Sequence, residues 1–223
     1  MALHVVFVLF PNVTQLDFTA PAQVLARVPD ARVTVAAKSS EAVPTDCGFG
    51  VLPASTFETA GQADLLCVPG GFGVADALAD RETVGFIREQ AAGARYVTSV
   101  CTGAFLLGAA GLLRGKRATT HWAYTGLLHL VGAEFAPGRV VVDGGTITGG
   151  GVTAGLDFAL TVAAEVAGAE VAQSIQLALE YDPAPPFQAG IPDKAPPPVR
   201  AAMDARYRQS AERMRAAIEG ANA

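Results

Sequence analysis

One cysteine stands between an apolar segment and an uncharged run of small and apolar residues. Arg95 to Val100 has the composition of a buried strand, and Thr102 to Leu113 predicts a buried helix. Cys101 lies on the turn between them. A strand-to-helix turn is strained and presents its side chain, and a helix amino terminus favours a thiolate over a thiol. We therefore predict a nucleophilic Cys101 whose pKa is lowered; the alternative is a small buried hydrophobe.

A glycine-rich turn ends a second apolar run. Asp64 to Val68 has the pattern of a short strand, and Pro69-Gly70-Gly71-Phe72-Gly73 follows it. Such a turn frees several backbone N–H groups, which an oxyanion or anion site requires. The Gly-Lys-Ser/Thr ending of a phosphate loop and the three-glycine dinucleotide fingerprint are missing, so no nucleotide cofactor is predicted. Gly70 and Gly71 either bind an oxyanion beside Cys101 or form an ordinary turn.

A cysteine nucleophile normally works with a proton carrier, and histidine is the first residue type to consider. The chain has three histidines, His4, His121 and His129. His121 is the best placed of them, because it follows a short strand that can end at the carboxyl edge of a sheet. His4 opens the first strand, and His129 falls in an apolar stretch.

Asp17 offers a second kind of proton carrier. It follows the first predicted strand by one short loop, and its neighbours Leu16 and Phe18 are apolar. Partial desolvation raises the pKa of a carboxyl group, so Asp17 can exchange protons with a nucleophile near neutral pH. The alternative is an aspartate that caps the first helix.

Alternating strands and helices must position these residues. Further strands are predicted at Leu3 to Phe10 and Arg32 to Ala37, and a hairpin joins Arg139 to Val142 with Thr146 to Thr148 through Asp143-Gly144-Gly145. Helices are predicted from Thr14 to Arg27, from a cap at Asp76 to Ala92, from Thr153 to Ala167 and from Glu170 to Glu180. The pattern predicts a doubly wound α/β sandwich that binds ligands at the carboxyl ends of its strands.

Composition limits the class of protein. A chain of 223 residues can bury a core of its own, and a net charge of -5 without a basic run argues against nucleic acid as a partner. Three cysteines without paired spacing predict neither disulfides nor a metal site, and so indicate a reducing, cytoplasmic setting. No apolar run is long enough to predict a membrane span.

The last part of the chain differs from the rest. Seven of the 14 prolines fall between Pro183 and Pro198, which predicts an extended arm, and a charged helix is predicted from Val199 to Glu219. We therefore expect one α/β domain over residues 1–182. Residues 183–223 are expected to pack on that domain or on a dimer partner.

Five segments together resemble the ThiJ/PfpI superfamily, and the match covers nearly the whole chain. They are Phe10-Pro11-Asn12 through Asp17-Phe18, Val68-Pro69-Gly70-Gly71, Ser99-Val100-Cys101-Thr102-Gly103-Ala104, Ala118-Thr119-Thr120-His121-Trp122, and Gly149-Gly150-Gly151-Val152-Thr153-Ala154-Gly155-Leu156-Asp157. The resemblance implies a flavodoxin-like fold of the kind found in class I glutamine amidotransferases, a homodimer and no cofactor. It also implies that Cys101 is the nucleophile and that Asp17 is near enough to act on it.

Two positions are similar to one branch of that superfamily. Thr102 stands where the intramolecular peptidases carry histidine, and Asp17 stands where deglycase and chaperone-like members usually carry glutamate. The branch implied adds water to an isonitrile to give an N-substituted formamide, with Thr102 in the site. Val152, beside the glycine triplet, either lines the pocket or packs in the core. The competing hypotheses are a dicarbonyl deglycase or glyoxalase-like enzyme and a non-enzymatic redox or stress sensor.

Overall fold

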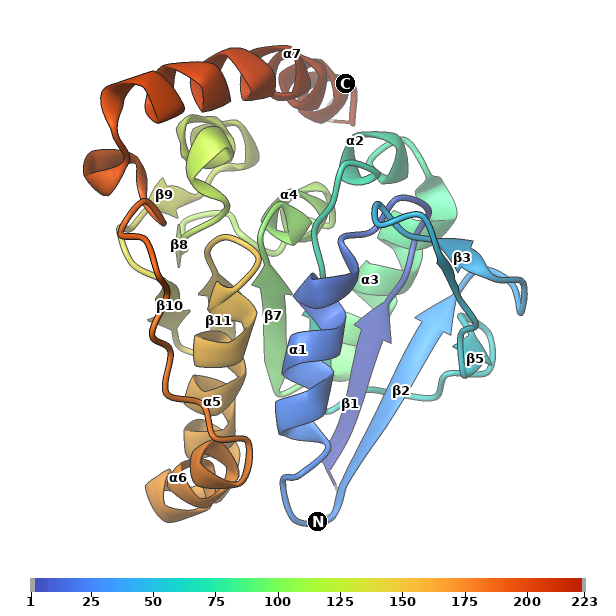
Figure 1. The fold of residues 1–223 in the computed structure, drawn as a ribbon. Helices are drawn as coiled ribbons and strands as arrows, with labels where there is room; N and C mark the ends of the chain where they lie inside the picture. The colour runs from blue at the N-terminus through green and yellow to red at the C-terminus, as the bar shows by residue number, and fades with distance from the viewer. Residues whose placement is uncertain (1–2, 222–223) are drawn as a thin grey trace.

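The computed structural model describes residues 3–221, which fold around one seven-stranded sheet (Figure 1). In spatial order its strands are β10 (Val140–Asp143), β11 (Thr146–Gly149), β7 (Tyr96–Val100), β6 (Leu65–Val68), β1 (Leu3–Val8), β2 (Ala31–Ala37) and β5 (Ser55–Thr56). Every neighbouring pair is parallel except β10 and β11, which form the predicted hairpin. The central order β2-β1-β6-β7-β11 is that of a flavodoxin-like sheet, so the predicted fold class is confirmed.

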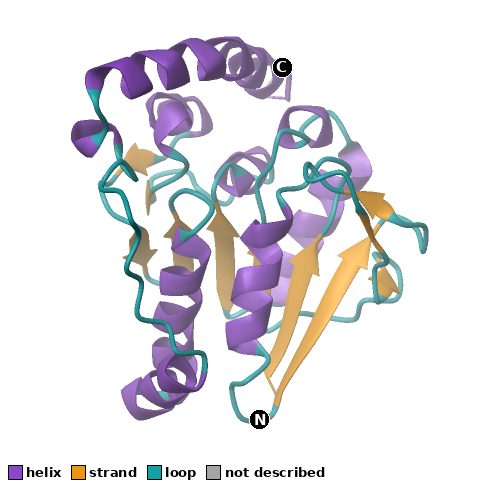
Figure 2. Cartoon of the chain, in the orientation of Figure 1, coloured by secondary structure: helices purple, strands orange, loops and turns teal. Residues whose placement is uncertain are grey.

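Helices cover both faces of the sheet (Figures 1 and 2). One face carries α1 (Gln15–Leu25), α5 (Ala154–Ala167) and α6 (Ala169–Ala178), and the other carries α3 (Arg81–Gly93) and α4 (Gly103–Ala109). Because both faces are covered, the central strands are apolar throughout: Val5, Val6, Phe7 and Val8 of β1 are each 0% exposed.

The predicted boundaries of two helices were wrong. Asp76 does not cap the long helix: it lies inside the short helix α2 (Val74–Ala77). The cap of α3 is Asp80, whose carboxylate accepts a hydrogen bond from the N–H of Glu82 at 3.2 Å. Helix α4 ends at Ala109 rather than Leu113, because Gly111 adopts a left-handed φ of 81° and closes the helix in a Schellman motif.

Short elements fill the connections between the main ones. They are β3 (Val43–Pro44), β4 (Gly50–Val51), β8 (Arg117–Ala118), β9 (Glu134–Phe135) and the 3-10 helices η1 (Trp122–Val131) and η2 (Pro192–Lys194). η1 follows the predicted short strand that precedes His121, and it begins directly after that histidine. His121 thereby stands at the same end of the sheet as Cys101.

The last helix, α7 (Pro197–Ala221), lies across the end of the molecule toward which β1 and β7 point (Figure 1). It packs against η1, α2 and α4, and its Met214 and Ile218 are 2% and 1% exposed. An ion pair between Arg213 and Asp76 adds a contact to α2. Within residues 3–221, no helix combines the length and apolar character needed to cross a membrane.

Candidate active site

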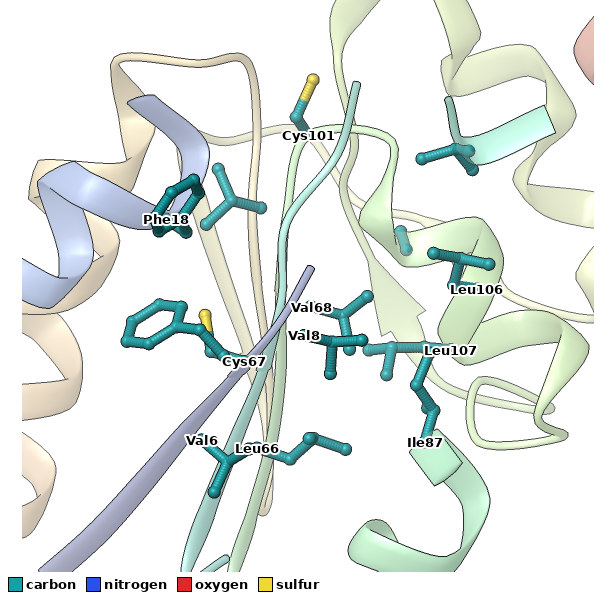
Figure 3. Close-up of a cluster of buried hydrophobic side chains, with 14 of the residues drawn as sticks. Val6, Val8, Phe18, Leu66, Cys67, Val68, Ile87, Cys101, Leu106 and Leu107 are labelled. Carbon is teal, nitrogen blue, oxygen red and sulfur yellow. The ribbon is translucent and has the colours of Figure 1, made fainter. Parts of the chain in front are cut away.

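Cys101 occupies the strained turn between β7 and α4, as predicted. Its φ of 57° lies in the left-handed region, which is costly for a residue with a Cβ atom. Hydrogen bonds hold the turn: its N–H donates to the carbonyl of Gly150 at 2.8 Å, and its own carbonyl accepts from the Thr120 hydroxyl at 2.7 Å. Its sulfur points away from the buried cluster around Val8 and Val68 (Figure 3). The fold thus fixes the direction of the thiol.

Asp17 comes from the first turn of α1 and is fully buried, at 0% exposure. It is not the cap of that helix, whose N-cap residue is Thr14. Instead, its Oδ2 accepts a hydrogen bond from the N–H of Gly70 at 2.9 Å. Oδ1 has no partner in hydrogen-bonding geometry within the described part of the chain. A buried carboxyl oxygen without a partner is costly, and it is available to carry a proton.

Gly70 and Gly71 join Asp17 to Thr102. The N–H of Gly71 donates to Oγ1 of Thr102 at 3.0 Å, while that of Gly70 donates to Asp17. A Cβ atom on Gly70 would stand 2.5 Å from the Thr102 nitrogen and 2.9 Å from Asp17 Oδ2, so only glycine fits there. In this structure both amides are therefore engaged by side chains of the site itself.

Burial controls the ionisation of the Asp17–Cys101 pair. It raises the pKa of Asp17 to about 7, although the Gly70 hydrogen bond and the interaction with Cys101 partly oppose the rise. Burial, followed by the nearby Asp17 charge, also raises the pKa of Cys101 well above its ordinary value. The expected lowering of the cysteine pKa was wrong, because desolvation outweighs the stabilisation by Thr102 at the helix start. The resting site thus holds a thiol, and Asp17 titrates near neutral pH.

We expect Asp17→Asn to stabilise the protein at pH 8 and not at pH 4. The pKa of Asp17 rises from 3.8 to about 7 on folding, so between these values the folded state binds more protons than the unfolded state. Stability therefore falls as pH rises through this window, and the loss persists above it. Removing the charge should recover about 2 to 4 kcal/mol of unfolding free energy at pH 8.

Urea unfolding of wild type and Asp17→Asn at both pH values measures this effect. Asp182→Asn is the matched control, because Asp182 is exposed. An equal change in stability at pH 4 and pH 8 would contradict a raised Asp17 pKa.

A cavity of about 110 Å³ opens above the thiol. Its lining comprises Thr14, Asp46, Gly71, Phe72, Cys101, Thr102, His121, Tyr124, Val152 and Tyr207. Five of the predicted site residues are in this lining, whereas Asp17 and Gly70 are not. The five are Gly71, Cys101, Thr102, His121 and Val152. Phe72, Tyr124 and Tyr207 of the lining were not predicted as site residues. Phe72 was considered only as part of the glycine-rich turn, and no local motif marks Tyr124 in η1 or Tyr207 in α7.

His121 enters the site as a neutral ring. Burial lowers its pKa to about 4, so it is uncharged at neutral pH. Its Nδ1 accepts from the N–H of Ala123 at 3.3 Å, which leaves the ring proton on Nε2. His121 is therefore suited to donate a hydrogen bond to a ligand in the pocket, and it is not a base near pH 7.

The doubly wound sheet and its cysteine turn define a class of protein: the chain belongs to the DJ-1/PfpI family, whose model matches residues 3–165. It is 56% identical over 196 residues to the isonitrile hydratase of Pseudomonas putida, across 88% of this chain and 86% of that protein. A ThiJ/PfpI family protein from Pseudomonas syringae is 39% identical and superposes with a TM-score of 0.95, covering 98% of this chain and 91% of that one.

A more distant structure, DJ-1beta of Drosophila melanogaster, is 26% identical, with a TM-score of 0.74. The match covers 100% of the Drosophila chain and 82% of the present chain. Part of the present chain therefore has no counterpart in the Drosophila protein.

Proposed function

We propose that this protein is an isonitrile hydratase, an enzyme that adds water to R–N≡C and releases R–NH–CHO. The observation that carries the proposal is the buried Asp17 carboxyl, with a pKa of about 7, next to Cys101 beneath a small pocket. The 56% identity to the Pseudomonas putida enzyme supports the substrate class. Water is the second substrate, and the protein supplies every catalytic group.

The first half of the reaction joins the cysteine to the substrate. Asp17, as carboxylate, takes the thiol proton, and the sulfur of Cys101 attacks the terminal carbon of the isonitrile. The same proton passes from Asp17 to that carbon, giving the thioimidate R–N=CH–S–Cys101. The backbone N–H and hydroxyl of Thr102 stabilise the sulfur while it carries negative charge.

The second half consumes water. Asp17 takes a proton from a water molecule as the water oxygen adds to the thioimidate carbon, and it passes that proton to the substrate nitrogen, which returns Asp17 to the carboxylate form. The adduct R–NH–CH(OH)–S–Cys101 then collapses: the carbon–sulfur bond breaks, the formamide C=O forms, and the hydroxyl proton returns through Asp17 to sulfur. In this scheme the N–H groups of Gly70 and Gly71 hold Asp17 and Thr102 in place. The backbone N–H of Thr102 stabilises the departing sulfur during collapse.

Thr102→Val is expected to lower kcat by about 10- to 100-fold with little change in KM. Valine keeps the shape of threonine, but it removes the acceptor for the Gly71 N–H and the hydroxyl that stabilises the sulfur. Steady-state kinetics of Thr102→Val and Thr102→Ser make the test. Serine should restore most of the rate; a serine variant as slow as the valine variant would argue against a role for the hydroxyl.

The proposal also covers the setting of the enzyme. We propose a cytoplasmic homodimer that binds neither nucleic acid nor membrane, with one α/β domain over residues 1–182. Residues 183–223 then complete that domain through α7, whose buried Met214 and Ile218 support packing on the same chain.

The direct test is production of N-phenylformamide from phenyl isonitrile, followed by chromatography, with a protein-free control. Turnover beyond one equivalent per Cys101 is expected. Glyoxal consumption without isonitrile turnover would instead favour a dicarbonyl enzyme. A stoichiometric reaction with peroxide and no turnover of either substrate would favour a redox sensor.

A further inference from the structure

The mouth of the pocket has an aromatic wall supplied by the C-terminal helix. Tyr207 of α7 lies half-buried in the pocket lining together with Phe72, Tyr124 and His121. Its ring centroid is 5.1 Å from that of His121 and 6.0 Å from that of Tyr124. The ring of Phe72 is nearly parallel to that of Tyr207, with 6.5 Å between centroids and 18° between planes.

Contacts of the Tyr207 ring and of its helix hold it at this place. The hydroxyls of Tyr124 and Ser210 are hydrogen-bonded at 2.7 Å, which ties α7 to η1 one turn beyond Tyr207. Met214 is buried at 2% exposure one turn further along the helix. Trp122 packs against the ring edge-on, with 5.5 Å between centroids. The ring is thus positioned before a ligand arrives, which lowers the entropic cost of binding.

The size of the cavity directs a substrate toward this wall. At about 110 Å³ it is smaller than a cavity of about 150 Å³ that encloses one benzene molecule. An isocyano carbon near Cys101 therefore leaves its R group extending toward Phe72 and Tyr207. Phe72 is 46% exposed, so this pair of rings faces both the cavity and solvent. Aromatic side chains at this place favour an aromatic R group through offset or edge-on ring contacts.

We propose that Tyr207 is a specificity-determining residue that makes the enzyme prefer isonitriles with an aromatic R group. The proposal rests on the hydratase function and adds the substrate class. The carboxylate of Asp46, in the same lining, further favours an R group without negative charge.

The experiment compares phenyl with cyclohexyl ligands, which are six-membered rings that differ in aromaticity. The variants are Tyr207→Leu, which keeps an apolar side chain but has no aromatic face, and Tyr207→Phe, which keeps the ring. Phe187→Ala serves as the matched control, because Phe187 is 78% exposed and lies outside the pocket lining. The first readout is the ratio of kcat/KM for phenyl isonitrile to that for cyclohexyl isonitrile.

In Tyr207→Leu this ratio should fall about five- to tenfold, mainly through a higher KM for the phenyl substrate. Tyr207→Phe and Phe187→Ala should stay within about twofold of wild type, since each keeps the aromatic wall. An equal loss for both substrates in Tyr207→Leu, or an unchanged ratio, would overturn the proposal.

A binding measurement separates this proposal from the hydratase function. N-Phenylformamide and N-cyclohexylformamide are titrated into Cys101→Ala, with and without Tyr207→Leu, using the fluorescence of Trp122, the only tryptophan. The proposal is supported if N-phenylformamide binds more tightly than N-cyclohexylformamide and this difference disappears with Tyr207→Leu. That result would stand even if the wild type turned over no isonitrile, because absent turnover would refute only the hydratase function. Two outcomes overturn the proposal. One is that N-phenylformamide does not bind to Cys101→Ala; the other is that Cys101→Ala, with Tyr207 intact, binds both formamides with equal affinity.

Discussion

Replacing Cys101 with alanine is expected to abolish formamide production, with a loss of at least about 10⁴-fold in kcat. The reason is that sulfur forms and later breaks a bond to the substrate carbon, and Cys101 supplies the only thiol among the described residues that line the pocket. Alanine removes one atom from a side chain that is 6% exposed, and the backbone hydrogen bonds of the turn remain. The measurement is turnover of phenyl isonitrile under saturating substrate.

Cys47→Ala is the matched control, because Cys47 is exposed and lies outside the pocket lining. It should retain the wild-type rate. Mass spectrometry of wild type quenched during turnover should also find the thioimidate adduct on Cys101 alone. Residual turnover within tenfold of wild type in Cys101→Ala would exclude covalent catalysis by this residue.

Asp17→Asn is expected to lower kcat by about 10² to 10⁴-fold and to remove a pH dependence centred near pH 7. The rate of the wild type should rise with pH through about 7, because the Asp17 carboxylate is the form that takes the thiol proton. Asparagine can still accept the hydrogen bond from Gly70, so the loss reports proton transfer rather than collapse of the site. The measurement is kcat/KM between pH 5 and 9.

The Asp46→Asn variant tests whether Asp17 is the catalytic carboxyl and Asp46 only a charge near it. Asp46 raises the pKa of Asp17 by repulsion, so this variant should keep the pH dependence and shift it to lower pH. An Asp17→Asn enzyme that retains the same transition near pH 7 would show that another group carries the proton.

The sheet was predictable because apolar runs and glycine-rich turns are local signals. Strand β1 and the β10–β11 hairpin are examples, as is the placement of Cys101 on a turn. Asp17 was also found from local context, since apolar neighbours on both sides indicate desolvation. By contrast, Asp76 and Asp80 are equally plausible caps four residues apart, and only the packed structure distinguishes them.

The ionisation of Cys101 and the aromatic wall were not predictable for a different reason. The sequence shows that Cys101 precedes a helix, which would lower the pKa of its thiol. The burial that raises this pKa instead depends on how segments distant in the sequence pack around the turn. Tyr207 is separated from Cys101 by more than a hundred residues, and its helix looks like an ordinary charged helix until it is seen over the pocket.

The segment of chain before α7 affects how much of the time α7, with Tyr207, stays docked over the pocket. Residues 182–191 form no helix or strand, and they connect α6 at one end of the molecule to the segment that leads into α7 at the other (Figure 1). The arm thus acts as a tether that keeps α7 at an effective concentration of about 1 mM. A helix whose isolated form bound the domain with a Kd of about 10 µM would then be docked about 99% of the time.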